Sequence, residues 1–331
     1  MTECDASWRE AALALLERVT GGDADVIAAD ATAWAAHPVG EVGRDGLVEL
    51  HAALRRALPD LERRDDIVLA GANAPDERWT GPRPSPMVVT IGCYLGTFRE
   101  PFLGIPPTGS VVALPYGEAH HVAGGRLRRS WLFWDVAGLM MRAGCWPLSP
   151  TTGTAGMWPA PKGGRGVRLA PSEERGSLDR VLEMHEGLNT FDGRDIETID
   201  MRHWAEGFTY WAGGAIGAAR GVEGFRAHHQ IPYRRAFPGA KGAGHFVRLS
   251  DGPFAATAGD VAVTHSGADY WGVAATGRAM RFRVMDVYRF DAAGLIAENW
   301  LPNDTLGLLD QMGVDVMARM RHLTGHPRRT L

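Results

Sequence analysis

The chain has 331 residues, a formal net charge of −4, 45% hydrophobic residues and 22% charged residues. This chain is longer than a domain with a single hydrophobic core usually is, so two domains are expected. The weak negative charge gives no reason to expect nucleic acid as a partner. No apolar run reaches the roughly 18 residues that span a bilayer, and the three cysteines have neither disulfide nor metal spacing, so we expect a cytoplasmic protein without a membrane partner.

The first half begins with helices and continues with strands. Apolar residues recur at helical spacing over residues 7–20 and 44–58. Alternation and β-branched residues predict strands over 87–95 and 111–122. A segment rich in proline and glycine and without periodicity follows at 147–172, and we interpret it as a linker.

The second half repeats this order of elements. The predicted helices are 178–190 and 222–236, and the predicted strands are 261–273 and 278–290. Gly277 supplies the residue that a hairpin turn between these strands needs. Because helices come first and antiparallel strands follow in each half, the fold class is predicted to be α+β.

Two motifs occur in both halves at matching positions. A Trp-x-x-x-Asp-x-x-Gly-Leu motif starts at Trp131 and again at Trp300, and each copy ends in a glycine at the same distance. A Gly-x-x-Gly motif that leads to a histidine starts at Gly43 and again at Gly221. The preserved order predicts a duplicated domain, with domains at 1–146 and 173–331 on either side of the linker.

Two longer segments then carry a family likeness. Residues 102–109 read Phe-Leu-Gly-Ile-Pro-Pro-Thr-Gly, and residues 286–313 combine an Asp-Val-Tyr-Arg-Phe strand with the repeated Trp and Asp motif. Both resemble SnoaL-like polyketide cyclases of the nuclear-transport-factor-2-like (NTF2-like) superfamily. The resemblance implies two cone-shaped domains, each a curved and mostly antiparallel sheet with N-terminal helices around an apolar pocket, and chemistry that needs no cofactor.

The same resemblance implies a general acid/base. In the cyclases, the aspartate after the tryptophan of the closing strand is the general acid/base of an aldol ring closure. The resemblance assigns this role to Asp304 and, in the first half, to Asp135. A carboxylate suits such proton transfer when apolar surroundings raise its pKa. The alternative role is a helix N-cap, because Asp304 precedes an apolar run.

Asp286 interrupts an apolar face of the predicted strand 278–290. A carboxylate there is costly unless it is paired or functional. The segment also resembles the ketosteroid isomerase strand that carries a protonated aspartic acid, which implies that Asp286 stabilises a substrate enolate. The alternative is a structural acid paired with Arg281 or Arg283. The aligned stretch 116–118 lacks this aspartate, which favours the second domain as the catalyst.

Aromatic residues and histidines are predicted to line the pocket. Flat rings suit stacking on a planar ligand, and core packing is the alternative for each of them. The predicted substrate-binding residues are His121, Trp131, His265, Trp271, Tyr288 and Trp300. The histidines lack metal-ligand spacing and no nucleotide-binding motif is present, so neither a metal nor a cofactor is predicted.

The chain is therefore predicted to be a cofactor-independent cyclase or isomerase that acts on a small hydrophobic carbonyl compound. The alternative from another class is a non-catalytic protein that binds a small molecule. Epoxide hydrolysis would require Arg281 or Arg283 to face inward, against the alternation. The expected assembly is a monomer whose two domains pack like a dimer, with a true homodimer left open.

Overall fold

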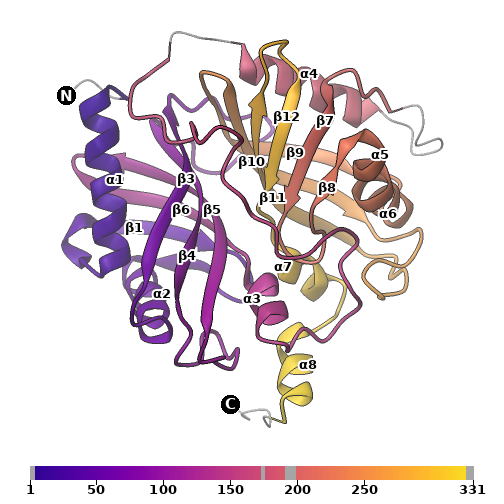
Figure 1. The fold of residues 1–331 in the computed structure, drawn as a ribbon, viewed down its shortest axis with the longest axis horizontal. Helices are drawn as coiled ribbons and strands as arrows, with labels where there is room; N and C mark the ends of the chain where they lie inside the picture. Colours follow the sequence, from indigo (N-terminus) through magenta and orange to yellow (C-terminus); the bar gives the residue numbers. More distant parts are fainter. Residues whose placement is uncertain (1–3, 173–175, 191–198, 326–331) are drawn as a thin grey trace.

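The computed structural model of the protein describes residues 4–172, 176–190 and 199–325. Each half of the chain forms one sheet with its own helices (Figure 1). The first domain contains α1 (Ala6–Gly21), η1 (Ala24–Val26), β1 (Ile27–Ala35), β2 (Gly40–Gly43), α2 (Arg44–Ala57), β3 (Glu62–Gly71), β4 (Met87–Thr97), β5 (Val111–Ala123), β6 (Arg126–Trp134) and α3 (Val136–Arg142).

The second domain contains the same succession with a divided helix. Its elements are α4 (Ser177–Thr190), β7 (Trp204–Ala212), β8 (Ala219–Arg220), α5 (Gly221–Phe225), η3 (Arg226–Gln230), α6 (Ile231–Ala236), β9 (Lys241–Asp251), β10 (Phe254–Thr264), β11 (Ala279–Phe290), β12 (Ile296–Leu301), α7 (Thr305–Gln311) and α8 (Val316–Leu323). The helix predicted over 222–236 is interrupted by the π-helical turn η3, a local widening that is frequent at functional sites.

Both sheets have one topology. The strand orders are β2-β1-β6-β5-β4-β3 and β8-β7-β12-β11-β10-β9. Each sheet is antiparallel except for one parallel pair, which is β1 with β6 in the first and β7 with β12 in the second. The prediction of two duplicated α+β domains is therefore confirmed.

The predicted strand 261–273 is wrong beyond Thr264. There the chain leaves the sheet, and Gly267 N donates to Ala236 O at 3.1 Å, at the end of α6 instead of to β11. The buried side chains after Thr264 imitate a strand although they pack against the end of α6, where the rings of His265 and Tyr270 lie 5.2 and 5.1 Å from that of Phe237. A hairpin turn at 274–277 is accordingly not formed between two long strands.

This segment contains a tight turn that occurs in both domains. Tyr270 and Val273 exchange two backbone hydrogen bonds of 2.9 Å around Trp271 and Gly272, whose φ angles are 51° and 76°. Leu103 and Gly104 form the same turn in the first domain, with φ angles of 50° and 80°. Two successive residues with positive φ define the turn, and glycine at the second position relieves its strain.

The two sheets pack against each other through their outer faces. One hydrophobic cluster draws residues from both, including Trp131 of β6, Phe246 of β9 and Trp300 of β12. The rings of Trp131 and Phe246 are stacked with centroids 4.8 Å apart. At Gly117 the sheets are so close that a Cβ atom would lie 2.2 Å from Pro302 Cγ. The outer faces therefore form a hydrophobic interdomain core.

The predicted linker is attached to both domains. Thr154 pairs with Ala218 beside β8, and further on Val167 pairs with Val68 of β3. Between these points Trp158 packs against the interdomain cluster. The segment crosses from one domain to the other along their surfaces, as Figure 1 shows.

Candidate functional site

The second domain encloses a cavity of about 180 Å³ between the inner face of its sheet and its helices. Apolar wall residues come from α4, from the helices after β8 and from the inner positions of β10 and β11. The polar wall residues are His185, Asn189, Tyr210, His229, Gln230, Tyr233, Arg234, His245, Asp286, Tyr288 and Asn299. A largely apolar cavity with a few converging polar groups has the character of a small-molecule site.

Asp286 lies in the wall of this cavity, on the face of β11 that alternation predicts. Asn299 Nδ2 of β12 donates to its Oδ1 at 3.0 Å. Burial raises the pKa of Asp286 to about 7, although the Asn299 amide and the Tyr288 hydroxyl act in the opposite direction. Arg283 cannot neutralise the carboxylate, because it forms an ion pair with Asp260 instead. Asp286 is thus poised to hold or release a proton near neutral pH.

One histidine contacts Tyr288, and a second histidine lies against the first. His185 Nε2 of α4 is 3.0 Å from Tyr288 Oη, and the rings of His185 and His245 are 5.2 Å apart. Burial lowers the pKa of His185 to about 4, and burial together with His185 and Arg248 lowers that of His245. Both imidazoles are therefore neutral at pH 7.

Four polar atoms of the cavity wall lack a hydrogen-bond partner among the described residues. They are His185 Nδ1, Tyr210 Oη, His229 Nδ1 and Gln230 Oε1. A buried polar group without a partner costs about 1–3 kcal/mol, so each needs an explanation. The Tyr210 hydroxyl is also near enough to Asp286 for that carboxylate, after burial, to raise the pKa of Tyr210. These groups are donors and acceptors that a ligand could satisfy.

A second hollow, of about 320 Å³, adjoins the cavity and shares His185, Asn189 and His245 with it. We call it the outer hollow. Its charged wall residues include Arg78 and Arg248. Arg78 belongs to the segment between β3 and β4 of the first domain, so both domains contribute to the outer hollow.

The first domain carries an acid at the position of Asp286. Trp131 pairs with Ala119 and the repeated Trp300 pairs with Val287, so the preceding residues, Glu118 and Asp286, are equivalent. The stretch 116–118 lacks an aspartate, and the strand register shows that Glu118 takes its place. The two domains differ in what surrounds the acid.

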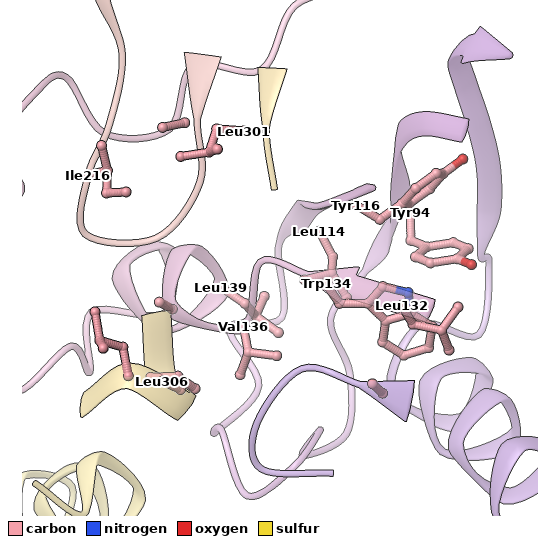
Figure 2. Packing of buried hydrophobic residues seen from close by; sticks show 14 of the residues in the cluster. Tyr94, Leu114, Tyr116, Leu132, Trp134, Val136, Leu139, Ile216, Leu301 and Leu306 are labelled. Carbon is pink, nitrogen blue, oxygen red and sulfur yellow. The ribbon is translucent and has the colours of Figure 1, made fainter. Parts of the chain in front are cut away.

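Large side chains occupy the corresponding interior of the first domain. The pairing registers match Arg63, Tyr94 and Tyr116 with Gly242, Val261 and Val284, which line the cavity of the second domain. Tyr94 and Tyr116 are fully buried and pack with Trp134 in the first core (Figure 2). Small residues at three equivalent positions thus leave space in the second domain.

Glu118 is tied into a buried ionic network. Arg63 Nη1 donates to Glu118 Oε2 at 2.8 Å, and Arg63 also pairs with Asp65 at 2.9 Å. Tyr94 and Trp134 donate to the other oxygen of Glu118. Burial alone would raise the pKa of Glu118, but Arg63 and His120 hold it well below its usual range. Unlike Asp286, Glu118 stays ionised and fully paired.

Asp304 and Asp135 cap helices across the domain interface. Asp304 Oδ1 accepts from Gly307 N of α7 at 3.0 Å and from His37 N of the first domain at 2.9 Å. Asp135 Oδ1 accepts from Gly138 N of α3 at 2.8 Å and, in the same pattern, from a backbone N–H of the second domain at 2.9 Å. Neither carboxylate is among the cavity lining residues.

The other predicted binding residues are distributed through the fold. Trp131 and Trp300 belong to the interdomain core. His121 Nδ1 and His265 Nε2 lie 2.9 and 3.1 Å from backbone carbonyl oxygens, and Trp271 forms the tight turn. Of the sequence-predicted site residues, the structure brings Asp286 and Tyr288 together in the cavity wall.

Sequence reasoning did not select His185, Tyr210, His245 or Asn299. A signal was present for Asn299, because it alternates with the outward-facing Trp300 and is therefore a polar residue on the inner face of an apolar strand. The others come from separate elements, α4, β7 and β9. Nothing local in the sequence indicates that these elements meet at one cavity.

Within residues 4–172, 176–190 and 199–325, no three His, Cys, Asp or Glu side chains are grouped so that they could hold a metal ion. None of the helices in this part of the chain combines the length and apolar character of a membrane span.

Residues 182–312 match the family model described as SnoaL-like polyketide cyclase. Curated proteins give no match. Among solved structures, AclR, a putative hydroxylase from Streptomyces galilaeus, is 19% identical and covers 42% of this chain and 98% of its own, with a TM-score of 0.34. IdmH, a putative polyketide cyclase from Streptomyces antibioticus, is 20% identical and covers 41% and 96%, with a TM-score of 0.33. The family match and the two sheets of one topology place a SnoaL-like domain in the second half of the chain, with the same fold repeated in the first half.

Proposed function

We propose that the second domain is a cyclase- or isomerase-type enzyme in which Asp286 transfers a proton to and from a hydrophobic carbonyl compound. The observation that carries the proposal is the raised pKa of Asp286, about 7, in the wall of a cavity that is otherwise mainly apolar. A general base works best when its pKa lies near the working pH. Asp286 meets that condition, whereas the paired Glu118 of the first domain does not.

The reaction begins when the Asp286 carboxylate takes a proton from the carbon beside the substrate carbonyl. The carbonyl oxygen becomes an enolate oxygen, and the unpaired Tyr210 hydroxyl is a suitable donor to it. In an isomerisation, Asp286 returns the same proton to another carbon of the conjugated system. In a ring closure, the enolate carbon attacks a second carbonyl carbon, and the new alkoxide oxygen takes the proton from Asp286.

Asp304 receives a different role from the one implied by the family resemblance. Its Oδ1 accepts two backbone hydrogen bonds at the domain interface, and a group used in this way is poorly placed to exchange protons with a ligand in the cavity. We therefore assign the acid/base role to Asp286 alone and interpret Asp304 as a structural cap.

Deuterium exchange at the α-carbon of 2-tetralone, a bicyclic ketone, tests the proposal by NMR in D₂O. The wild-type protein is expected to accelerate exchange, and Asp286→Asn to reduce that acceleration by about 10²–10⁴-fold, the usual contribution of a general base. Asp304→Asn is the matched control, because asparagine keeps the Oδ1 acceptor, and it is expected to retain the activity. The assignment is refuted when Asp286→Asn is active and Asp304→Asn is not.

The non-catalytic alternative has one observation in its favour, namely that the first domain has lost the equivalent cavity to bulky side chains. Fluorescence titration with 2-naphthol, a stable aromatic analogue of an enol, separates the two functions. Binding of 2-naphthol without any exchange of 2-tetralone would favour the binding protein. Epoxide hydrolysis gains no support, since Arg283 pairs with Asp260 on the outer face of the sheet.

A further inference from the structure

A segment of the first domain lies along β9, the edge strand of the second sheet, next to the cavity. Between β3 and β4 the chain runs along β9, where Ala74 N donates to Arg248 O at 3.1 Å and Asp76 N donates to His245 O at 2.9 Å. The Asn73 side chain binds this strand as well, accepting from Arg248 N at 2.9 Å. Backbone bonds therefore hold Asp76 at the level of two residues that line the outer hollow.

Asp76 fixes the position of the Arg248 side chain. Asp76 is only 5% exposed, and its Oδ2 forms an ion pair with Arg248 Nη2. Arg78 pairs with the same oxygen at 2.6 Å from the solvent side. The two guanidinium groups hold the pKa of Asp76 far below its usual range, against the effect of burial. The carboxylate is thus ionised throughout the neutral range and anchors Arg248.

Arg248 in turn determines the tautomer of His245. Its Nε donates to His245 Nδ1 at 3.1 Å. A guanidinium nitrogen is always a donor, so Nδ1 must be the acceptor and the imidazole hydrogen must reside on Nε2. His245 lines both the cavity and the outer hollow, and its Nε2 has no hydrogen bond to a described residue. An N–H donor is therefore available to a bound molecule.

We propose that Asp76 of the first domain is a positioning residue for the site of the second domain: through Arg248 it keeps His245 as an Nε2–H donor that hydrogen-bonds an oxygen atom of the ligand. The kind of ligand rests on the proposed function, but the positioning of His245 does not. The first domain, whose own interior is filled, thereby completes the site of its partner domain.

The test uses the full chain labelled with ¹⁵N-histidine. A long-range ¹H–¹⁵N spectrum, with His245 assigned through its loss in His245→Gln, is expected to show an unprotonated Nδ1 and a protonated Nε2. In Asp76→Asn the two nitrogen signals are expected to move toward each other, because Arg248 is no longer held and both tautomers become populated. The dissociation constant of 2-naphthol should rise about threefold to tenfold, as expected for one weakened hydrogen bond.

Glu77→Gln is the matched control, since it removes a charge from the neighbouring exposed residue and should change neither readout. Should Asp76→Asn fail to fold, Arg248→Met is expected to give the same change in the His245 spectrum. If the His245 spectrum of folded Asp76→Asn is unchanged, like that expected for Glu77→Gln, the positioning role of Asp76 is refuted. If neither the wild-type protein nor any variant binds 2-naphthol or accelerates deuterium exchange of 2-tetralone, the proposed function is refuted. The histidine spectrum still decides the role of Asp76 in that case.

Discussion

Three aspartates of the same chain show how surroundings decide the use of a carboxyl group. Asp135 and Asp304 each direct one oxygen to two backbone N–H groups, and burial raises the pKa of Asp304 in spite of these bonds. The Asp286 carboxylate accepts a hydrogen bond from the Asn299 amide and interacts with the neighbouring Tyr288 hydroxyl. It forms no ion pair with a described residue, and it lines the cavity. Desolvation is therefore the dominant effect on Asp286, and it yields a group that can change protonation state near pH 7.

The raised pKa of Asp286 predicts a pH-dependent effect on stability. Between about pH 4 and pH 7 the folded protein keeps this proton while the unfolded chain, with an ordinary value of 3.8, has released it. The unfolded state then binds fewer protons, so stability falls as pH rises through this window, by on the order of 4 kcal/mol in total. Asp286→Asn should therefore melt at a higher temperature than wild type at pH 8.

Thermal melts at several pH values check this expectation. The advantage of Asp286→Asn should shrink as the pH is lowered from 8 to 4, because the folded wild-type protein takes up the proton below about pH 7 and then no longer buries a charge. An advantage that stays constant over this range would show that the pKa of Asp286 is not raised in the folded protein.

At the scale of elements, the repeated Trp-x-x-x-Asp-x-x-Gly-Leu motif encodes a joint between domains. The tryptophan ends on the outer face of the closing strand and packs in the interdomain core, and the aspartate begins the next helix. Helices α3 and α7 consequently lie near each other at the interface (Figure 1). The motif repeats because each domain supplies one half of a pseudo-symmetric contact.

The caps predict a clear difference between two substitutions of Asp304. Asp304→Ala removes the acceptor for Gly307 N and His37 N and should lower the free energy of unfolding by about 1–2 kcal/mol. Asp304→Asn keeps an Oδ1 acceptor and should lose much less. Urea denaturation monitored by tryptophan fluorescence measures both values. Equal stability of the alanine variant and wild type would contradict the capping role.

At the scale of the whole molecule, the two domains share a topology but divide their tasks. The first has a filled interior with an ionic network around Glu118, and the second has a cavity around Asp286. The first domain also supplies Arg78 to the outer hollow, and its Asp76 forms an ion pair with Arg248, another residue of that hollow. Duplication has therefore left one domain to carry the candidate site and the other to support it.

The ionic network predicts a strong effect on stability without an effect on the site. Arg63→Met leaves Glu118 buried without its cation and should cost about 3–5 kcal/mol, the usual cost of breaking a buried pair. The double variant Arg63→Met with Glu118→Gln should recover part of this loss, because no buried charge remains unpaired. Urea denaturation gives the stabilities, and 2-naphthol affinity should match wild type in any variant that folds. A single variant as stable as wild type would contradict the network's role.

Much of the fold could be predicted from sequence because its signals are local or periodic. The spacing of Trp131 and Trp300 to their aspartates revealed the duplication, and alternation on β11 placed Asp286 on the inner face. Alternation misled at residues 265–273, where burial against a helix resembles burial within a sheet. The sequence also left the two roles of Asp304 open, because a catalytic acid and a helix cap occur at the same position of a motif.

The sequence by itself determined the number of domains, their α+β class and the inward-facing position of Asp286 on β11. Only the tertiary structure decided which domain has a cavity. In the first domain, Arg63, Tyr94 and Tyr116 lie on three different strands but meet in one interior. In the second domain, the equivalent residues Gly242, Val261 and Val284 leave that space free. The contact of Asp76 with Arg248 likewise joins positions far apart in the chain. Local patterns specify which face a residue occupies, but the volume and charge that it meets there are set by side chains from distant segments.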